Sequence, residues 1–265
     1  MSNQNKTIWI TGASSGIGEA LAYGYATEGA NLILSSRTIE TLNQVGEQCY
    51  KMGANKVDIV PIDLAKHDKI PAIIEATLQT LNSIDILINN GGISQRSSVK
   101  DTTLAVDKRI FDVNFFGAVA MTKAILPQML QQNSGRIVVI SSVAGKVSTP
   151  LRSAYAASKH ALHGFYDALR YELKHTNIAV TVICPGYIKT NLSLNALTKD
   201  GSTHGKMDDN QRNGMSTSQF CKKAMQVIEK GQDEAVIGGF ETLGVYLKRF
   251  FPSILKWYVG RSVVK

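Results

Sequence analysis

A tyrosine, a lysine and a serine are the residues of this chain whose types and spacing best suit chemistry. Tyr155 and Lys159 lie in the pentapeptide YAASK, and Ser142 stands upstream in the tripeptide ISS. Residues at positions i and i+4 share one face of a helix, so the ammonium of Lys159 is expected close to the phenol of Tyr155.

These three groups suit the transfer of a proton to or from an oxygen atom. A carbonyl that accepts a hydride becomes an alkoxide, and a phenol with a pKa near 10 exchanges protons poorly at neutral pH. Lys159, together with the positive charge that the hydride donor carries once it is oxidised, is expected to lower the pKa of Tyr155 by about 2–3 units. Tyr155 would then act as general acid in reduction and as general base in oxidation. Ser142 would stabilise the charge that develops on the same oxygen.

The segment TGASSGIG, residues 11–18, is a second place where chemistry is expected. It follows a short apolar run and precedes a helical pattern, and glycine stands at positions 12, 16 and 18. A turn of this kind lets the backbone approach a pyrophosphate, and the start of the helix offers unpaired N–H groups and a positive dipole. We therefore predict a nucleotide site formed by Gly12, Ser14, Ser15, Gly16, Ile17 and Gly18.

Strand-like apolar runs alternate with helical stretches along the chain, and this alternation predicts a parallel sheet covered by helices on both faces. The predicted strands are Thr7–Thr11, Asn31–Ser36, Lys56–Pro61, Asp85–Asn89, Arg136–Ser141, Ile178–Cys184 and Glu234–Ile237. The predicted helices are Gly16–Glu28, Ile39–Lys51, Asp68–Leu81, Thr103–Gln131 and Ser153–His175. The expected fold class is α/β, a Rossmann-type doubly wound parallel sheet with strand order 3-2-1-4-5-6-7, in a single domain over residues 1–265.

Taken together, these motifs resemble the short-chain dehydrogenase/reductase family from Thr7 to about Ile237. That family has NNAG after its fourth strand, and this chain has NNGG there, with Gly91 in place of the alanine. The resemblance implies a further set of cofactor-binding residues: Asp63, Leu64, Asn90, Gly91, Gly92, Pro185, Gly186, Ile188 and Thr190. In the family, the position of Asp63 holds the adenine and that of Thr190 contacts the nicotinamide carboxamide.

The end of the second predicted strand indicates which nicotinamide cofactor is used. A carboxylate there would accept hydrogen bonds from the ribose of NAD and repel a 2′-phosphate. This chain has no acid at that point and carries Arg37, whose planar guanidinium suits a phosphate. We therefore predict NADP(H), as the family resemblance also implies; a plain surface arginine is the alternative.

The resemblance assigns the catalytic set Asn114, Ser142, Tyr155 and Lys159. It implies that Lys159 also holds the ribose hydroxyls and that Asn114 supports a relay of water leading to Lys159. The expected activity is an NADPH-dependent reductase of a small-molecule carbonyl, or the reverse alcohol dehydrogenase. A non-catalytic NADP-sensing or scaffold protein is the alternative, but such proteins usually lack the tyrosine or the lysine. A nucleotide-sugar epimerase would need a larger domain after Pro185.

The composition excludes several other classes of protein. Hydrophobic residues make up 44% and charged residues 19% of the 265 residues, unlike a disordered or collagen-like chain. The net charge is +8, but the basic residues are scattered, so no nucleic-acid partner is expected. The three cysteines are widely spaced and without a CxxC pair, so neither a disulfide nor a metal site is expected. The histidines His160, His163 and His175 are expected on helix surfaces.

The polar segment 191–218 breaks the alternation, and we interpret it as a substrate lid because a long loop in a compact domain is usually functional or mobile. Between Thr190 and Asp208 it is similar to the 7B-like subgroup of the same family. Activity in that subgroup is attributed to lipid-type ketones such as acyl-dihydroxyacetone phosphate, so the resemblance implies a lipid-like carbonyl.

The tail over residues 245–265 combines aromatic and basic residues with no acidic ones, and Pro252 is expected to divide it into two short segments. Such a composition suits peripheral contact with a membrane. Packing of the aromatics on the subunit or on a partner subunit is the alternative. No run reaches the roughly 18 uninterrupted apolar residues of a membrane span, and no signal peptide is evident, so the expected location is cytoplasmic.

The helices that carry Asn114 and Tyr155 are apolar on all sides. In the family that the chain resembles, these two helices pair with a second subunit. A homodimer or homotetramer is therefore expected.

Overall fold

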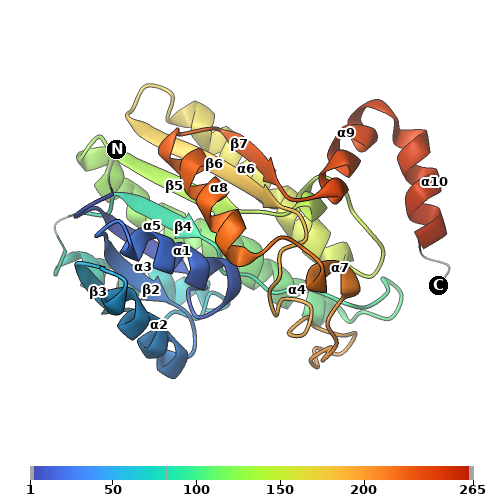
Figure 1. The fold of residues 1–265 in the computed structure, drawn as a ribbon, viewed down its shortest axis with the longest axis horizontal. Helices are drawn as coiled ribbons and strands as arrows, with labels where there is room; N and C mark the ends of the chain where they lie inside the picture. Colours follow the sequence, from blue (N-terminus) through green and yellow to red (C-terminus); the bar gives the residue numbers. More distant parts are fainter. Residues whose placement is uncertain (1–2, 82, 263–265) are drawn as a thin grey trace.

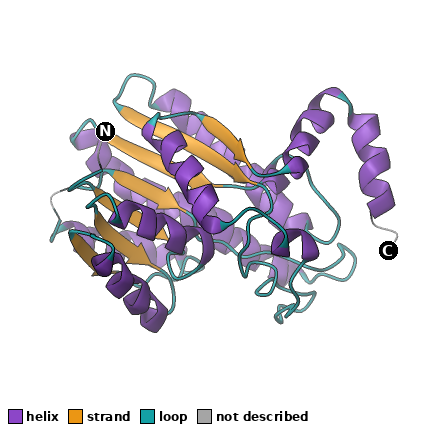
Figure 2. Ribbon diagram, viewed as in Figure 1, coloured by secondary structure: helices purple, strands orange, loops and turns teal. Residues whose placement is uncertain are grey.

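A central parallel sheet organises the chain in the computed structural model, which describes residues 3–81 and 83–262 (Figures 1 and 2). Its strands are β1 (Thr7–Thr11), β2 (Asn31–Ser35), β3 (Lys56–Ile59), β4 (Ile86–Asn89), β5 (Gly135–Ile140), β6 (Ile178–Pro185) and β7 (Glu234–Ile237). They are arranged in the order β3-β2-β1-β4-β5-β6-β7 and every neighbouring pair is parallel. The predicted fold class and strand order are confirmed.

Helices cover both faces of the sheet. The helices of the described residues are α1 (Gly16–Ala26), α2 (Ile39–Lys51), α3 (Ile70–Leu78), α4 (Leu104–Phe111), α5 (Gly117–Gln131), α6 (Ser153–Glu172), α7 (Asp209–Arg212), α8 (Thr217–Glu229), α9 (Leu243–Phe250) and α10 (Pro252–Ser262), of which α7, α9 and α10 lie outside the layers on the sheet. Short 3-10 turns lie at His67–Lys69 (η1), Val143–Gly145 (η3) and Phe240–Thr242 (η4).

Two apolar cores lie on opposite faces of the sheet because side chains alternate along each strand. Ile8 and Ile10 of β1 join the core that contains Leu21 of α1 and Phe220 of α8. Trp9, between them, joins the core that contains residues of α3, α5 and α6. Strands buried on both faces explain why the sequence runs are apolar throughout rather than alternating.

The predicted helix 103–131 is interrupted, which is a correction. A π-helical turn, η2 (Asp112–Phe116), separates α4 from α5. A turn of this kind inserts an extra residue and often marks a functional position. By length and composition, Leu104–Gln131 could cross a membrane. Met121, Ile125 and Met129 are nevertheless fully buried, so α5 contributes one face to the core of the fold.

The segment 191–218 is packed structure rather than a free loop. It contains α7, and Leu197 forms isolated bridges with Gln95 and Thr203. Helix α8, which the sequence analysis did not predict, begins at Thr217, within the end of this segment, with a capping box between Ser216 and Gln219.

The tail forms two helices, and Pro252 begins the second of them, as predicted. Figure 1 shows α9 leaving the body of the molecule and α10 lying outside it, beyond α9. The predicted tail ran to residue 265, and residues 263–265 lie outside the described part of the chain.

Candidate active site

A cavity of about 700 Å³ opens at the carboxyl ends of the strands. That is the edge at which ligands bind in open α/β sheets. Its lining includes most of the residues singled out in the sequence: Gly12, Ser14, Ser15, Gly16, Ile17, Arg37, Asp63, Leu64, Asn90, Gly91, Gly92, Ser142, Tyr155, Lys159, Pro185, Gly186, Ile188 and Thr190. Two residues of the predicted set, Gly18 and Asn114, are not part of the lining.

The glycine loop between β1 and α1 is held against the loop after β4. Gly12 has a φ of +65°, and a Cβ there would lie 2.8 Å from the Cα of Gly91. A Cβ on Gly18 would lie 2.3 Å from the carbonyl oxygen of Gly12, so Gly18 allows the helix to start close to the turn. The side chain of Asn90 donates to the carbonyl oxygens of Thr11 and Gly12, at 3.0 and 3.2 Å. These contacts give the loop a fixed shape before any ligand binds.

The loop after β2 lines the cavity well away from Tyr155 along the sheet, because β1 and β4 lie between β2 and β5. Arg37 is exposed there and lines the cavity beside Ser36 and Thr38. Among the described residues, no carboxylate forms an ion pair with Arg37.

The structure also explains why glycine stands at position 91, where the family has alanine. A Cβ on Gly91 would lie 2.4 Å from the Cδ1 atom of Leu64, which is too close.

The opposite end of the cavity contains Tyr155 and Lys159 on α6 and Ser142 at the start of η3. The Ser142 hydroxyl accepts a hydrogen bond from the backbone N–H of Ala144 at 3.0 Å and is also hydrogen-bonded to the phenol of Tyr155. The Nζ atom of Lys159 donates to the carbonyl oxygen of Ile140 at 2.8 Å and lies 6.0 Å from the centre of the Tyr155 ring. Tyr155 and Lys159 are buried.

Burial controls the ionisation of both groups. It raises the pKa of Tyr155, because removal from water disfavours the phenolate, and the Ser142 hydrogen bond and the charges of Arg152 and Arg96 lower it by less. Burial also lowers the pKa of Lys159 to about 8. Burial thus outweighs the neighbouring cations in this structure, and the lowering of the Tyr155 pKa expected from Lys159 together with an oxidised nicotinamide stays a prediction. In this arrangement the buried tyrosine keeps its proton at neutral pH.

Asn114 lies behind the cavity wall, in the π-helical turn. Its amide donates to the carbonyl oxygen of Ile93 and to the hydroxyl of Ser158, each at 3.0 Å, and its carbonyl accepts from the N–H of Ile93 at 2.8 Å. Ser158 in turn donates to the carbonyl oxygen of Tyr155 at 2.8 Å. The carboxamide therefore ties the loop after β4 to the helix that carries the tyrosine and the lysine.

His163 is buried, and its expected place on a helix surface is wrong. One ring nitrogen, Nε2, lies 3.0 Å from the hydroxyl of Ser141, and the other, Nδ1, lies 3.3 Å from a carboxylate oxygen of Glu234. The hydroxyl of Ser141 also donates to the carbonyl oxygen of Lys159 at 3.2 Å. A chain of polar contacts thus runs from β7 to the backbone beneath the catalytic lysine.

The sulfur of Cys184 adds a third potential metal ligand to this cluster, and the ligand atoms lie within 4.8 Å of one another. The ammonium of Lys146 lies 2.6 Å from Glu234, and burial raises the pKa of Cys184 to about 12. A protonated thiol and a neutralised carboxylate favour a structural network over a metal centre.

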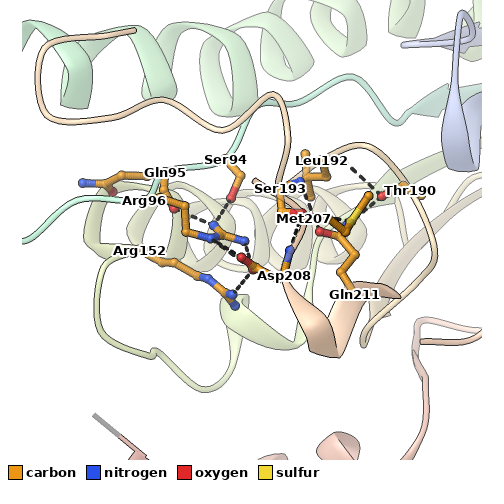
Figure 3. A network of polar contacts seen from close by, with 10 residues as sticks. All are labelled: Ser94, Gln95, Arg96, Arg152, Thr190, Leu192, Ser193, Met207, Asp208 and Gln211. Atoms are coloured by element: carbon orange, nitrogen blue, oxygen red, sulfur yellow. Dashed lines mark hydrogen bonds and ion pairs between the residues drawn. The ribbon is translucent and has the colours of Figure 1, made fainter. Parts of the chain in front are cut away.

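The lid is joined to the body by a two-part polar network (Figure 3). At one end the carboxylate of Asp208 accepts hydrogen bonds from two guanidiniums. One is that of Arg96, in the loop after β4, and the other is that of Arg152, in the turn before α6, whose nitrogen lies 2.8 Å from a carboxylate oxygen. These guanidiniums hold the pKa of Asp208 below its usual value despite burial. Arg152 immediately precedes α6, so this ion-pair network fastens the lid beside Tyr155.

The other end of the network reaches the cavity lining. Gln211 donates from its side chain to the hydroxyl of Thr190 at 2.7 Å and accepts from the N–H of Ser193 at 3.1 Å. The Ser193 hydroxyl accepts from the backbone N–H of Asp208 at 3.1 Å. A continuous set of hydrogen bonds therefore connects Thr190, in the predicted nicotinamide end, with the aspartate that fastens the lid.

Sequence reasoning missed this network. Arg152, three positions before Tyr155, was the one available signal, because it is a charged residue immediately before the same helix. Arg96, Asp208 and Gln211 are separated in the sequence and carry no recognisable local pattern. The cavity lining also includes Ile93, Val113 and Arg109, which were not predicted.

Comparisons with known proteins agree with this architecture. A family model described as short chain dehydrogenase matches residues 6–200. Dehydrogenase/reductase SDR family protein 7-like of Drosophila melanogaster is 41% identical over 264 residues, covering 98% of this chain and 81% of that protein. Dehydrogenase/reductase SDR family member 7B of Mus musculus is 39% identical over 255 residues, covering 95% and 79%. The similarity to the 7B-like subgroup therefore extends well beyond the lid.

Solved structures show the same fold. A short-chain dehydrogenase from Streptomyces avermitilis superposes with a TM-score of 0.83 at 26% identity, with complete coverage of both chains. A short-chain dehydrogenase/reductase from Burkholderia phymatum, in complex with NAD, has a TM-score of 0.86 at 23% identity and 96% coverage of each chain.

Proposed function

Because this chain belongs to the short-chain dehydrogenase family, we propose that it is an NADPH-dependent reductase of carbonyl compounds, able to run in reverse as an alcohol dehydrogenase. The observation that carries the proposal is the shared cavity. Ser142, Tyr155 and Lys159 line it together with the glycine loop at residues 12–17. A protein that only sensed the nucleotide would have no need of this buried proton-transfer group.

The residues present fit a nicotinamide dinucleotide. Gly12 has a backbone conformation that favours glycine, and any Cβ there would fill the space beside Gly91. The start of α1 would bind the pyrophosphate through its N–H groups, with Ser14 and Ser15 adding hydroxyl donors. Asp63 would hold the adenine, and Thr190 the nicotinamide carboxamide.

The chain's own residues would control the proton and the charge on the substrate oxygen. NADPH, when bound, supplies a hydride to the carbonyl carbon. Tyr155 donates its phenolic proton to the carbonyl oxygen, and the raised pKa of the buried phenol keeps that proton in place at neutral pH. Ser142 donates a hydrogen bond to the same oxygen and stabilises its developing charge. Lys159 would hold the ribose hydroxyls, and its ammonium would place a positive charge near the phenol of Tyr155.

A preference for NADPH over NADH rests on Arg37. It is exposed at the cavity edge, and no carboxylate pairs with it among the described residues. A guanidinium in this position is available for a 2′-phosphate, with which it forms paired hydrogen bonds. The end of β2 carries no carboxylate, which would have repelled such a phosphate.

The lid supports a substrate larger than a short-chain ketone, and we take a lipid-like carbonyl as the class to test first. Leu192 and Ile93 line the cavity, together with the polar Asn195 and Gln211. A pocket of this kind offers apolar contact for a chain and a few polar groups to orient it.

A carbonyl panel tests the proposed function. Oxidation of NADPH is followed at saturating cofactor with short-chain ketones, long-chain ketones, steroids and sugars as separate substrates. We expect turnover with at least one long-chain ketone and weaker turnover with short-chain ones. Absence of turnover across the panel, in a protein that binds NADPH, would instead support the non-catalytic alternative.

A further inference from the structure

The helices α9 and α10, with the turn η4 before them and the bend between them, expose many large apolar side chains. Those of Phe240, Leu243, Tyr246, Phe250, Phe251, Ile254 and Trp257 are between 47% and 77% exposed. Soluble monomers rarely leave a large group of such side chains in water unless the surface meets a partner or a membrane. The alternative that these aromatics pack on the core of their own subunit is therefore wrong.

The charge of the same helices has one sign. From Thr242 to the end of the chain the sequence contains no aspartate or glutamate. Lys248, Arg249 and Lys256 are exposed on the described part of this segment. Apolar aromatic groups among basic residues are the composition of helices that lie in the interface of a bilayer with anionic lipids.

The base of these helices is fixed to the rim of the cavity. The carboxylate of Glu241 accepts a hydrogen bond from the backbone N–H of Tyr187 at 2.7 Å, next to the cavity-lining Gly186. The ammonium of Lys248 donates to the carbonyl oxygen of Lys146 at 2.7 Å, just after η3. The exposed surface is therefore carried by helices anchored to the loops that bear Gly186 and Ser142, and it is not a loose end.

We propose that α9 and α10 form a docking surface for the anionic leaflet of a lipid bilayer. Charge decides between this occupant and a second copy of the chain. Two such tails brought together would place like charges against one another, whereas an anionic leaflet neutralises them. Phe250, Phe251 and Ile254 surround the bend between the two helices and would enter the headgroup region, with the basic side chains at the level of the phosphates.

Docking in this way would hold the cavity rim close to the bilayer. This inference stands apart from the proposed reaction, because it rests on the tail alone and its test needs no substrate.

Sedimentation of the full chain with vesicles tests the proposal. The vesicles are mixed phosphatidylcholine–phosphatidylserine in one set and pure phosphatidylcholine in the other. We expect the protein to sediment with the mixed vesicles at low salt, to sediment less as salt rises, and to remain mostly in solution with phosphatidylcholine alone. A protein that stays in solution with mixed vesicles at low salt overturns the proposal.

Two double variants separate the apolar and the charged contributions. Phe250→Ser with Phe251→Ser should reduce partitioning on the order of 100-fold, from the loss of two buried aromatic groups. Arg249→Glu with Lys256→Glu should reduce it by at least about tenfold.

Matched controls make the same chemical changes elsewhere. Val99→Ser with Tyr171→Ser removes two exposed apolar side chains outside the tail, and Lys222→Glu with Lys223→Glu makes the same change in charge on α8. Both controls should partition like the wild type. Equal losses in the tail variants and their controls would overturn the proposal. So would a tail variant that leaves vesicle binding intact but lowers the mass measured by light scattering, which would identify a surface for self-association.

Discussion

The side-chain amide of Asn114 donates a hydrogen bond to the hydroxyl of Ser158 at 3.0 Å, joining the π-helical turn to the helix of Tyr155 and Lys159. Both residues are almost completely buried. Because Ser158 passes this contact on to the carbonyl oxygen of Tyr155, the turn at Asp112–Phe116 fixes the part of α6 that does the chemistry. Asn114 is thus a positioning residue that acts through Ser158.

Cofactor choice should depend on Arg37. We expect the wild type to bind NADPH about 10- to 100-fold more tightly than NADH, as one charged hydrogen-bonded contact would give. Arg37→Ala should reduce this ratio by weakening NADPH binding and leave NADH binding nearly unchanged. Lys51→Ala, which removes an exposed cation from the following helix, is the control. Equal dissociation constants for the two cofactors in the wild type would contradict the assignment.

Asp208 should control the lid without acting on the cofactor. Asp208→Asn removes the charge that holds Arg96 and Arg152 but keeps the backbone N–H that donates to Ser193. We expect KM for the carbonyl substrate to rise about tenfold while the dissociation constant of NADPH stays within about twofold. Asp209→Asn alters only an exposed ion pair with Arg212 and serves as the control. An unchanged KM in Asp208→Asn would mean that the ion pairs do not hold the lid.

His163 should contribute to stability because it is buried between two polar partners. His163→Leu leaves the hydroxyl of Ser141 and the carboxylate of Glu234 without it, and we expect a loss of about 1–3 kcal/mol in the free energy of unfolding. The exposed His175→Leu, in the turn after the same helix, should change it by less than about 0.5 kcal/mol. Urea unfolding measures both. Similar midpoints for the two variants would show that the contacts of His163 add nothing.

The pH profile of reduction should follow Lys159. Burial lowers the pKa of this lysine to about 8, whereas it raises that of Tyr155, so the lysine loses its proton first as pH rises. The ammonium is present below that pH, and its loss above it weakens the hold on the ribose. We therefore expect kcat/KM for reduction to be level near neutral pH and to fall above about pH 8. A profile that stays level far above pH 8 would exclude Lys159 as the titrating group.

Much of the fold follows from local sequence patterns. Strand β1 and helix α2 have the predicted bounds, because continuous apolar runs and amphipathic spacing are local properties. Helix α8 was missed although Ser216 and Gln219 form a capping box, a signal that lies within the sequence. The π-helical turn could not be foreseen, since its extra residue is stabilised by contacts of Asn114 with Ile93 and Ser158 that are distant in the sequence.

The site follows the same division. The glycine loop and the Tyr155–Lys159 pair were recognisable because their spacing is local, and the structure brings them to one cavity. The raised pKa of Tyr155 could not be recognised from the sequence, because it depends on how deeply the side chain is buried. His163 lies one helical turn after Lys159 and so shares its buried face, a spacing that the sequence did contain. The homodimer or homotetramer stays a prediction. Phe116 is exposed on the helical segment that is expected to contact a second subunit.

The role of Tyr155 is the centre of this account, and one comparison tests it directly. NADPH oxidation is measured with a confirmed carbonyl substrate for the wild type, for Tyr155→Phe and for Tyr171→Phe, an exposed tyrosine later in the same helix. We predict that Tyr155→Phe lowers kcat by a factor of about 100 to 10,000 with NADPH affinity nearly unchanged, and that Tyr171→Phe behaves as the wild type. Near-normal turnover by Tyr155→Phe would contradict the mechanism.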